Sequence, residues 1–194
     1  MLLFLLLLLL LTLTLHCCLD DHGGNVSAQI AYTQDQKRWV YPDWYYGFTK
    51  TFADAETNAE VTMEFLMFDT VIADTVVNAD GSREYSAEIR KEHPHVRFVP
   101  KGAPTAEAQW EWLESKMKAS TADYLWVGGH YAVWSGCSHG PDKTLNAKLK
   151  PMLEKYHATG YMNGAHACPL LRAHQLGLPR SCVCRHTLAR QLQL

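Results

Sequence analysis

The chain has 194 residues, of which 47% are hydrophobic and 20% are charged, and its formal net charge is −2 at pH 7. This length predicts one domain with a substantial core, and the composition excludes an intrinsically disordered chain. The balanced charge, without a basic stripe, argues against a nucleic-acid partner.

An apolar leader opens the chain. Between Met1 and Leu15 the apolar run is interrupted only by Thr12 and Thr14. This length suits the hydrophobic region of a signal peptide and is shorter than the ~20 residues of a membrane span. No Lys or Arg precedes the run and no Ala-x-Ala site follows it, so an uncleaved anchor or a misplaced start are the alternatives. We expect residues 1–18 to be a secretory leader, with no stable membrane span and a secreted or lysosome-like location.

Two further features concern the compartment. Asn25-Val26-Ser27 is an N-glycosylation sequon, which has meaning only in a secreted chain, and Asn25 is therefore the candidate glycosylation site. The six cysteines lie mostly near the ends of the chain, and their spacing does not form a compact disulfide framework. Cys137 fits either a free thiol or a disulfide partner.

The N-terminal half predicts few regular elements. The aromatic-rich segment 39–52 indicates an extended pair of strands near an edge of the core. The apolar run 61–68 predicts a buried strand that ends at Asp69 and Thr70. Residues 74–104 contain acids, bases, glycines and three prolines, so we expect a long excursion with little regular structure.

A helix and a strand are predicted next. Thr105 stands before an acidic first turn, as an N-cap residue does, and apolar residues repeat at helical spacing as far as Met117. Trp110 and Trp112 of this helix are expected to pack rather than to form a binding site. The apolar run 124–127 then predicts a strand.

The remaining segments complete the predicted domain. Residues 144–156 predict an amphipathic helix that tolerates Pro151, and 161–164 predict a short strand and turn. Strands that alternate with helices in this way are typical of an α/β fold with a parallel pair of strands. We expect the domain to occupy residues 19–168 and the basic stretch 169–194 to be an irregular tail.

The sequence Gly128-Gly129-His130, which follows the predicted strand 124–127, is the most informative feature of the chain. Glycines let a backbone approach a neighbouring group closely, and the histidine is presented at the carboxyl end of the strand. In open α/β sheets this edge is where ligands and metals bind. His130 is therefore the first candidate metal ligand, and the alternative is a hydrogen-bonded histidine in a chain without metal.

Several segments, in the same order, resemble the purple, tartrate-resistant acid phosphatases, a branch of the calcineurin-like metallophosphoesterases. These segments are 24–32, 68–71, 109–135, 139–141 and 149–153, within a resemblance that runs from about Asp21 to Gly164. The resemblance implies a partial metallophosphoesterase sandwich of α/β class, with two mixed β-sheets flanked by helices, truncated at both ends relative to the family. It also implies hydrolysis of phosphate monoesters, small molecules or phosphoproteins, by a hydroxide that a di-iron or iron–zinc centre activates.

The resemblance distributes the metal ligands of the family over five loops, and this sequence departs from most of them. The first two loops would precede Asp21, where the sequence has only the leader. In the third loop, the metal-binding Asn falls on Leu19 and the transition-state histidine falls on Asp20, so no catalytic residue is secure. The fourth loop matches at His130.

The fifth loop of the family reads Gly-His-Asp-His, whereas this chain has Ala165-His166-Ala167 after its glycine. His166 is one residue out of register and fits at most as a single ligand. His139 belongs to a His-Gly-Pro turn that the family shares, and it is the candidate residue near the phosphate pocket.

Because His130 is the only matched ligand, we expect the chain not to bind the metals of the family. An acid phosphatase that is truncated or inactive is the first reading of the sequence. A non-catalytic secreted phosphatase-like glycoprotein and a mis-assembled gene model are the alternatives.

Overall fold

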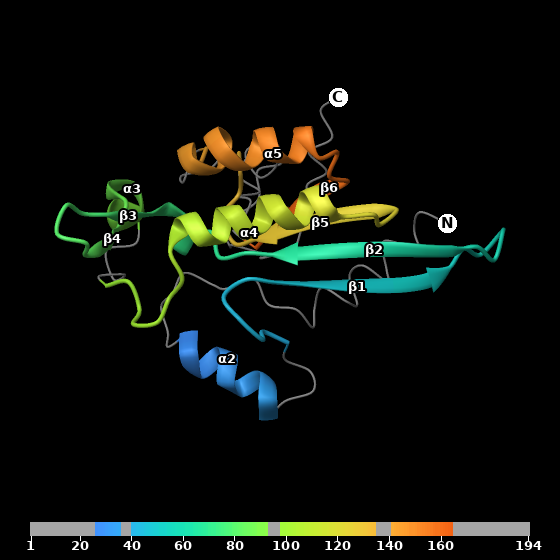
Figure 1. Cartoon of the computed structure of the whole chain (residues 1–194), viewed down its shortest axis with the longest axis horizontal. Helices are drawn as coiled ribbons and strands as arrows, with labels where there is room; N and C mark the ends of the chain where they lie inside the picture. Colours follow the sequence, from blue (N-terminus) through green and yellow to red (C-terminus); the bar gives the residue numbers. More distant parts are fainter. Residues whose placement is uncertain (1–25, 36–39, 93–97, 135–140, 165–194) are drawn as a thin grey trace, which may run out of the picture.

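The computed structural model describes residues 26–35, 40–92, 98–134 and 141–164 (Figure 1). A four-stranded sheet with the order β1-β2-β5-β6 forms its centre, and a two-stranded sheet, β3-β4, lies at one end. The strands of the larger sheet are β1 (Tyr46–Ala53), β2 (Glu60–Met67), β5 (Tyr124–Gly129) and β6 (Gly160–Asn163). The predicted α/β class, with two sheets and flanking helices, is confirmed.

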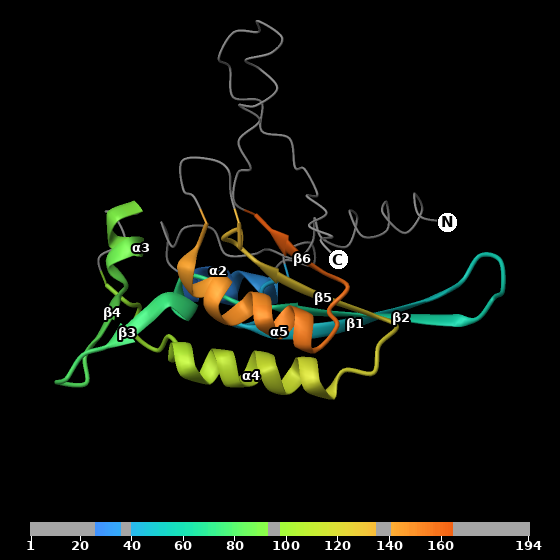
Figure 2. The same cartoon turned by 90° about the horizontal axis from the view of Figure 1, so that it is seen from above.

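The larger sheet is mixed. Strands β1 and β2 pair as an antiparallel hairpin, whereas β2–β5 and β5–β6 are parallel. One parallel pair was predicted, and the sheet contains two. Parallel neighbours need long crossovers, and helices provide them here. Helix α4 (Ala106–Ala119) lies between β2 and β5 in the chain, and α5 (Lys150–Lys155) precedes β6. Figure 2 shows α4 and α5 on the same side of the sheet.

The period of two along each strand separates the two faces of the sheet. Leu66, Leu125 and Val127 are buried in one core cluster with Leu113 of α4 and with Leu149. Each of these side chains is at most 6% exposed. Full burial of one such side chain contributes about 1.5–3 kcal/mol, so this cluster holds both helices on the sheet.

The opposite face is aromatic and rich in methionine. Met63, Phe65 and Met162 form its buried cluster, and the Phe48 ring stacks on Phe65 with centroids 4.8 Å apart. Helix α2 (Val26–Asp35), seen below the sheet in Figure 1, belongs to a separate cluster with the Tyr46 end of this face. Helix α2 was not among the predicted elements.

Helix α4 begins where it was predicted. The Thr105 hydroxyl accepts a hydrogen bond from the N–H of Ala108 at 3.1 Å, as an N-cap does. Trp110 is buried, and its indole N–H donates to the carbonyl of Ala73 at 3.0 Å. The ring of Trp112 lies 4.8 Å from the ring of Tyr45. Both tryptophans are packing residues, as predicted.

The second predicted helix is present but divided. A π-helical turn, η2 (Leu145–Leu149), leads directly into α5. Pro151 explains this division because proline has no N–H and so cannot donate the α-helical hydrogen bond to the carbonyl four residues earlier. The N–H of Lys150 donates instead to Leu145, five residues earlier. The wider turn places Pro151 in the first turn of α5, where a missing N–H costs little.

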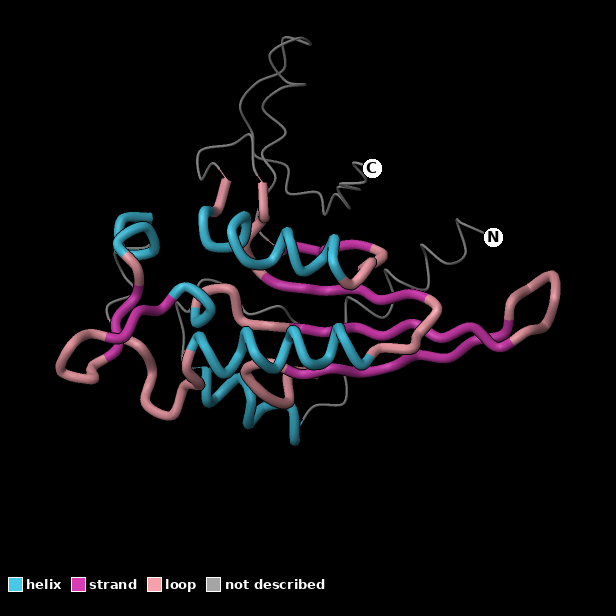
Figure 3. Tube along the Cα trace, turned by 45° about the horizontal axis from the view of Figure 1, so that its top comes forward, coloured by secondary structure: helices cyan, strands magenta, loops and turns pink. Residues whose placement is uncertain are grey.

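The prediction of an irregular excursion over 74–104 is wrong. The 3₁₀ turn η1 (Ile72–Asp74) leads into β3 (Thr75–Val77), which pairs antiparallel with β4 (Arg83–Tyr85), and α3 (Ala87–Glu92) follows. In Figure 3 this unit projects from one end of the molecule. Its strands have three residues each, too few for an alternating pattern to be recognised in the sequence.

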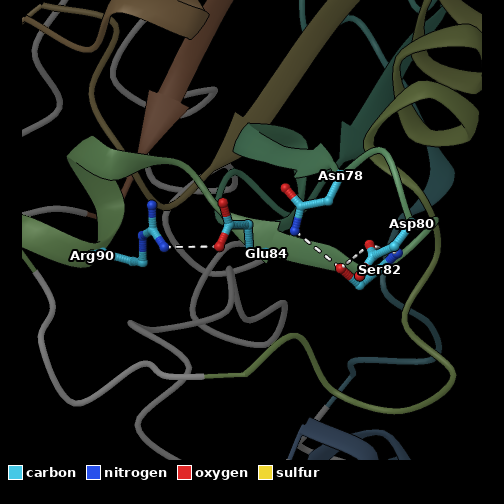
Figure 4. Close-up of polar contacts among 5 residues, drawn as sticks. All are labelled: Asn78, Asp80, Ser82, Glu84 and Arg90. Carbon is cyan, nitrogen blue, oxygen red and sulfur yellow. Dashed lines mark hydrogen bonds and ion pairs between the residues drawn. The ribbon is translucent and has the colours of Figure 1, made fainter.

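Polar side chains close the β3–β4 hairpin (Figure 4). Asp80 accepts hydrogen bonds from the N–H of Ser82 at 2.9 Å and from its hydroxyl at 2.6 Å, and the Asn78 amide donates to the same hydroxyl. Gly81 has a φ of +80°, which other residues rarely adopt. Arg90 of α3 pairs with Glu84 of β4 at 2.8 Å, so the helix is tied to the hairpin.

The predicted strand pair in 39–52 is also wrong, because this segment supplies one strand only. Residues 41–45, which contain Pro42, form no strand, and 43–45 are a bend. The N–H of Trp44 donates to the carboxylate of Asp43, and β1 starts at Tyr46 with β2 as its partner. Pairing with β2 aligns Phe48 with Phe65 and gives the apolar face its stacked rings.

The predicted leader, tail and domain boundaries lie outside the described residues. Within the described ranges, no helix combines the length and the apolar character that a membrane crossing needs.

Candidate functional site at the carboxyl ends of the parallel strands

His130 directly follows β5, at the edge where β2 and β6 also end. Its side chain is partly buried, and its ring centroid lies 5.3 Å from that of Tyr131. The predicted placement of a histidine at this edge is confirmed, whereas its role as a metal ligand stays a prediction.

Gly129 is required by close packing at this edge. A Cβ at this position would lie 2.5 Å from the Tyr161 hydroxyl and 2.6 Å from Cγ2 of Thr70. It would also lie 3.2 Å from the Phe68 ring. The two shorter distances are below what real Cβ atoms tolerate, so a side chain here needs its neighbours to move. The close backbone approach expected of this glycine is confirmed.

Three hydrogen bonds hold the main chain on both sides of His130. The N–H of Tyr131 donates to the Thr70 hydroxyl at 3.1 Å, and the carbonyl of Tyr131 accepts from the Tyr161 hydroxyl at 2.7 Å. The carbonyl of Gly129 accepts from the N–H of Gly164 at 3.2 Å. The end of β5 is therefore fixed to β2 on one side and to β6 on the other.

Asp69 brings a buried carboxylate to the same edge. Its Oδ1 accepts from the N–H groups of Val71 and Ile72, both at 3.0 Å, so this oxygen caps the turn η1. The buried Gln109 side chain pairs with the N–H and the carbonyl of Asp69, both at 2.8 Å. These contacts give Asp69 a structural role, because it caps η1 and joins the end of β2 to α4.

Tyr85 is the second buried titratable group of this region. Burial raises the pKa of its hydroxyl well above the ordinary value of 10, and the nearby charge of Asp69 adds to the increase. Tyr85 therefore stays protonated at neutral pH and offers no base.

The other predicted site residues lie outside the described residues. They are Asp20, Asn25, His139 and His166, together with Leu19, Ala165 and Ala167. The described part of the chain contains no group of three or more His, Cys, Asp or Glu side chains that could hold a metal ion.

Several of the described groups around His130 are already engaged with the framework of the fold. The hydroxyls of Thr70 and Tyr161 are engaged with the main chain of Tyr131, and an oxygen of Asp69 caps η1. Of the predicted ligands, only His130 is among the described residues at this edge.

Comparison with known proteins gives a consistent set of relatives. No family model matches the sequence. Over 144 residues, the chain is 36% identical to tartrate-resistant acid phosphatase type 5 of Mus musculus and 35% identical to that of Homo sapiens. Each alignment covers 74% of this chain and 39% of the relative. Purple acid phosphatase 17 of Arabidopsis thaliana is 35% identical over 86 residues, 44% of this chain and 25% of the relative. The chain spans about two fifths of the length of the type 5 relatives.

A solved structure supports the fold. GAP50, described as the anchor in the inner membrane complex of Plasmodium, superposes with a TM-score of 0.51 and 18% sequence identity. The match covers 72% of this chain and 38% of GAP50. At this identity the likeness concerns the fold alone, and it is consistent with a partial metallophosphoesterase sandwich.

Proposed function

Because this chain is a relative of the tartrate-resistant acid phosphatases over 144 residues, we propose that it is a phosphatase-fold protein without hydrolytic activity of its own. In this proposal it keeps the histidine-bearing strand end of the family but does not bind two metals. The observation that carries the proposal is that residues at metal-ligand positions of the family have no donor atoms in this chain.

A two-metal centre binds the phosphate between two cations, one of which lowers the pKa of a bound water. Leu19, Ala165 and Ala167 stand at positions where the family has ligands, and their side chains have no donor atom. Asp20, in place of a proton-donating histidine, adds a negative charge that repels phosphate. His130 then remains as the matched ligand, with His166 as a second at most.

Hydrolysis of phosphate monoesters is the second candidate function, favoured by the 36% identity to a curated acid phosphatase. It would require a di-iron or iron–zinc centre, with small phosphate monoesters or phosphoproteins as substrates.

One experiment separates the two functions. The full chain is purified, its iron and zinc content is measured, and its hydrolysis of p-nitrophenyl phosphate at acidic pH is compared with that of His130→Ala. We expect equal background rates and fewer than two metals per chain. Hydrolysis that His130→Ala abolishes, with about two bound metals, contradicts the proposal and supports the second function.

We also propose that residues 1–18 are a secretory leader, that 19–168 form the domain before an irregular tail, and that Asn25 is glycosylated. Ser27, the hydroxyl residue of the sequon, is exposed at the start of α2, which supports access to this site. In secreting cells we expect a product that lacks the leader and loses mass in Asn25→Gln. A cytosolic product that begins at Met1 contradicts this proposal.

Sequencing of the transcript across both ends of the reading frame tests the remaining alternative, a mis-assembled gene model. A transcript that encodes the chain as given contradicts that alternative.

A further inference from the structure

We propose that Thr70 and Tyr161 are positioning residues for His130. Their hydroxyls, from the end of β2 and from β6, hold the residue that follows His130 and so fix where the imidazole lies. The inference rests on the second candidate function in one respect, because there His130 is the residue that would meet a metal ion.

The two hydroxyls act on the two polar groups of one residue. Thr70 accepts from the N–H of Tyr131, and Tyr161 donates to its carbonyl. A backbone N–H and a carbonyl beyond the end of a strand have lost their sheet partners and need others when buried. Thr70 and Tyr161 supply both partners, so the chain cannot turn away from the sheet at His130 without breaking a hydrogen bond.

Steric contact adds to these hydrogen bonds. The Tyr161 hydroxyl occupies the space in which a Cβ of residue 129 would lie, and the methyl group of Thr70 occupies its other side. The backbone at Gly129 is thus enclosed by the same two side chains that bind Tyr131. His130 lies between two residues that are both held by Thr70 and Tyr161.

Thr70 and Tyr161 are themselves held in place by their surroundings. Thr70 is 2% exposed and follows Asp69, whose backbone is paired with the buried Gln109. Tyr161 lies on β6 opposite Val127 of β5, with its ring 6.4 Å from the Phe68 ring. Side chains with locked surroundings can fix a neighbouring functional group, which is the property that a positioning residue needs.

The test compares single-atom changes in the full chain. Tyr161→Phe removes one hydroxyl, and Thr70→Val replaces the other with a methyl group of similar size. Thr70→Ser retains the hydroxyl and is the conservative variant. Tyr124→Phe removes a hydroxyl at the other end of β5 and is the matched control.

The readout is the NMR signal of the His130 ring in protein labelled with ¹³C-histidine, assigned by its loss in His130→Gln. Amide hydrogen exchange of Tyr131 is measured alongside. We expect Tyr161→Phe and Thr70→Val to shift the ring signal, with Thr70→Ser and Tyr124→Phe close to the original chain. In Thr70→Val, loss of one hydrogen bond should accelerate exchange at Tyr131 roughly fivefold.

An unchanged His130 signal in folded Tyr161→Phe and Thr70→Val overturns the proposal, even if exchange at Tyr131 accelerates. If Thr70→Val does not fold, the ring signal of Tyr161→Phe decides alone. No metal and no substrate is present in this experiment, so its outcome is independent of the hydrolysis assay.

Discussion

Replacing Gly129 with Ala perturbs the site at its tightest point. The added Cβ would lie 2.5 Å from the Tyr161 hydroxyl and 2.6 Å from the Thr70 methyl group. Carbon atoms pack best at about 3.5–4.0 Å, so these neighbours must retreat by about 1 Å. Neither neighbour is the free end of a long side chain, since each is engaged with Tyr131.

Three contributions set the size of the effect of Gly129→Ala. Overpacking of a buried site costs about 1–3 kcal/mol, and losing the hydrogen bond from Tyr161 costs about 1 kcal/mol more. The lower entropy of the unfolded alanine chain offsets about 0.4–1 kcal/mol. The expected loss in the free energy of unfolding is therefore about 2 kcal/mol.

Urea unfolding followed by tryptophan fluorescence measures this loss. With a slope of about 1–3 kcal/mol per molar urea, the midpoint should fall by roughly 1 M. Gly47→Ala in β1 is the control, because its Cβ would approach the flexible end of Leu66 at 3.0 Å and should be accommodated. Adding Thr70→Ser to Gly129→Ala removes one of the two clashing atoms and should restore part of the midpoint. A midpoint of Gly129→Ala equal to or above that of the original chain refutes the steric reasoning.

Two other changes test the framework of the fold, one beside the site and one at the opposite end of β5. Gln109→Leu removes both hydrogen bonds between the Gln109 side chain and the backbone of Asp69, whose carbonyl still accepts from the N–H of Ala73, and should cost about 1–3 kcal/mol in urea unfolding. Glu111→Leu on the exposed side of α4 should cost little. Asp123 accepts hydrogen bonds from the backbone N–H and, as a smaller effect, from the hydroxyl of Thr62, and these lower its pKa below the ordinary value of 3.8. The ionised Asp123 carboxylate therefore stabilises the folded chain above pH 3.8, and this stabilisation is lost as the pH falls through the lowered pKa. The difference in urea midpoint between the original chain and Asp123→Ala should therefore shrink at pH values below 3.8, and a difference that is constant with pH contradicts this assignment.

The long elements of the fold could be predicted because each has a local signal. The apolar run of β2, the N-cap at Thr105 and the glycine pair before His130 each specify structure within a few residues. Helix α2 has no such signal, since it lacks an acidic first turn and a basic last turn, and Val26 alone is buried among the side chains of α2 that the structure describes. The β3–β4 hairpin has a turn signal in Asp80-Gly81. Its strand β3 could not be recognised, because the neighbouring Val76 and Val77 are both exposed and give no alternating apolar pattern.

The interactions that define the site could not be predicted, because they join residues far apart in the chain. Thr70 and Tyr131 are separated by 61 positions, and Tyr131 and Tyr161 by 30. The sequence indicated that something approaches Gly129 closely, but the register of β2 and β6 decides which side chains do. A threonine directly after one strand and a tyrosine within the next were the available signals, and both are common in cores.

From the parallel pairing of β2 with β5 we expect a particular order of folding. Met63 is aligned with Tyr124, which gives a separation of 61 residues (124 minus 63). Closing so long a loop is slow, whereas the β1–β2 hairpin and helix α4 involve only local contacts. We therefore expect the edge of β2 that pairs with β5 to stay exposed during folding, when it could pair with a strand of another molecule. We therefore expect the residues around His130, which require β2, β5 and β6 together, to assemble late in folding.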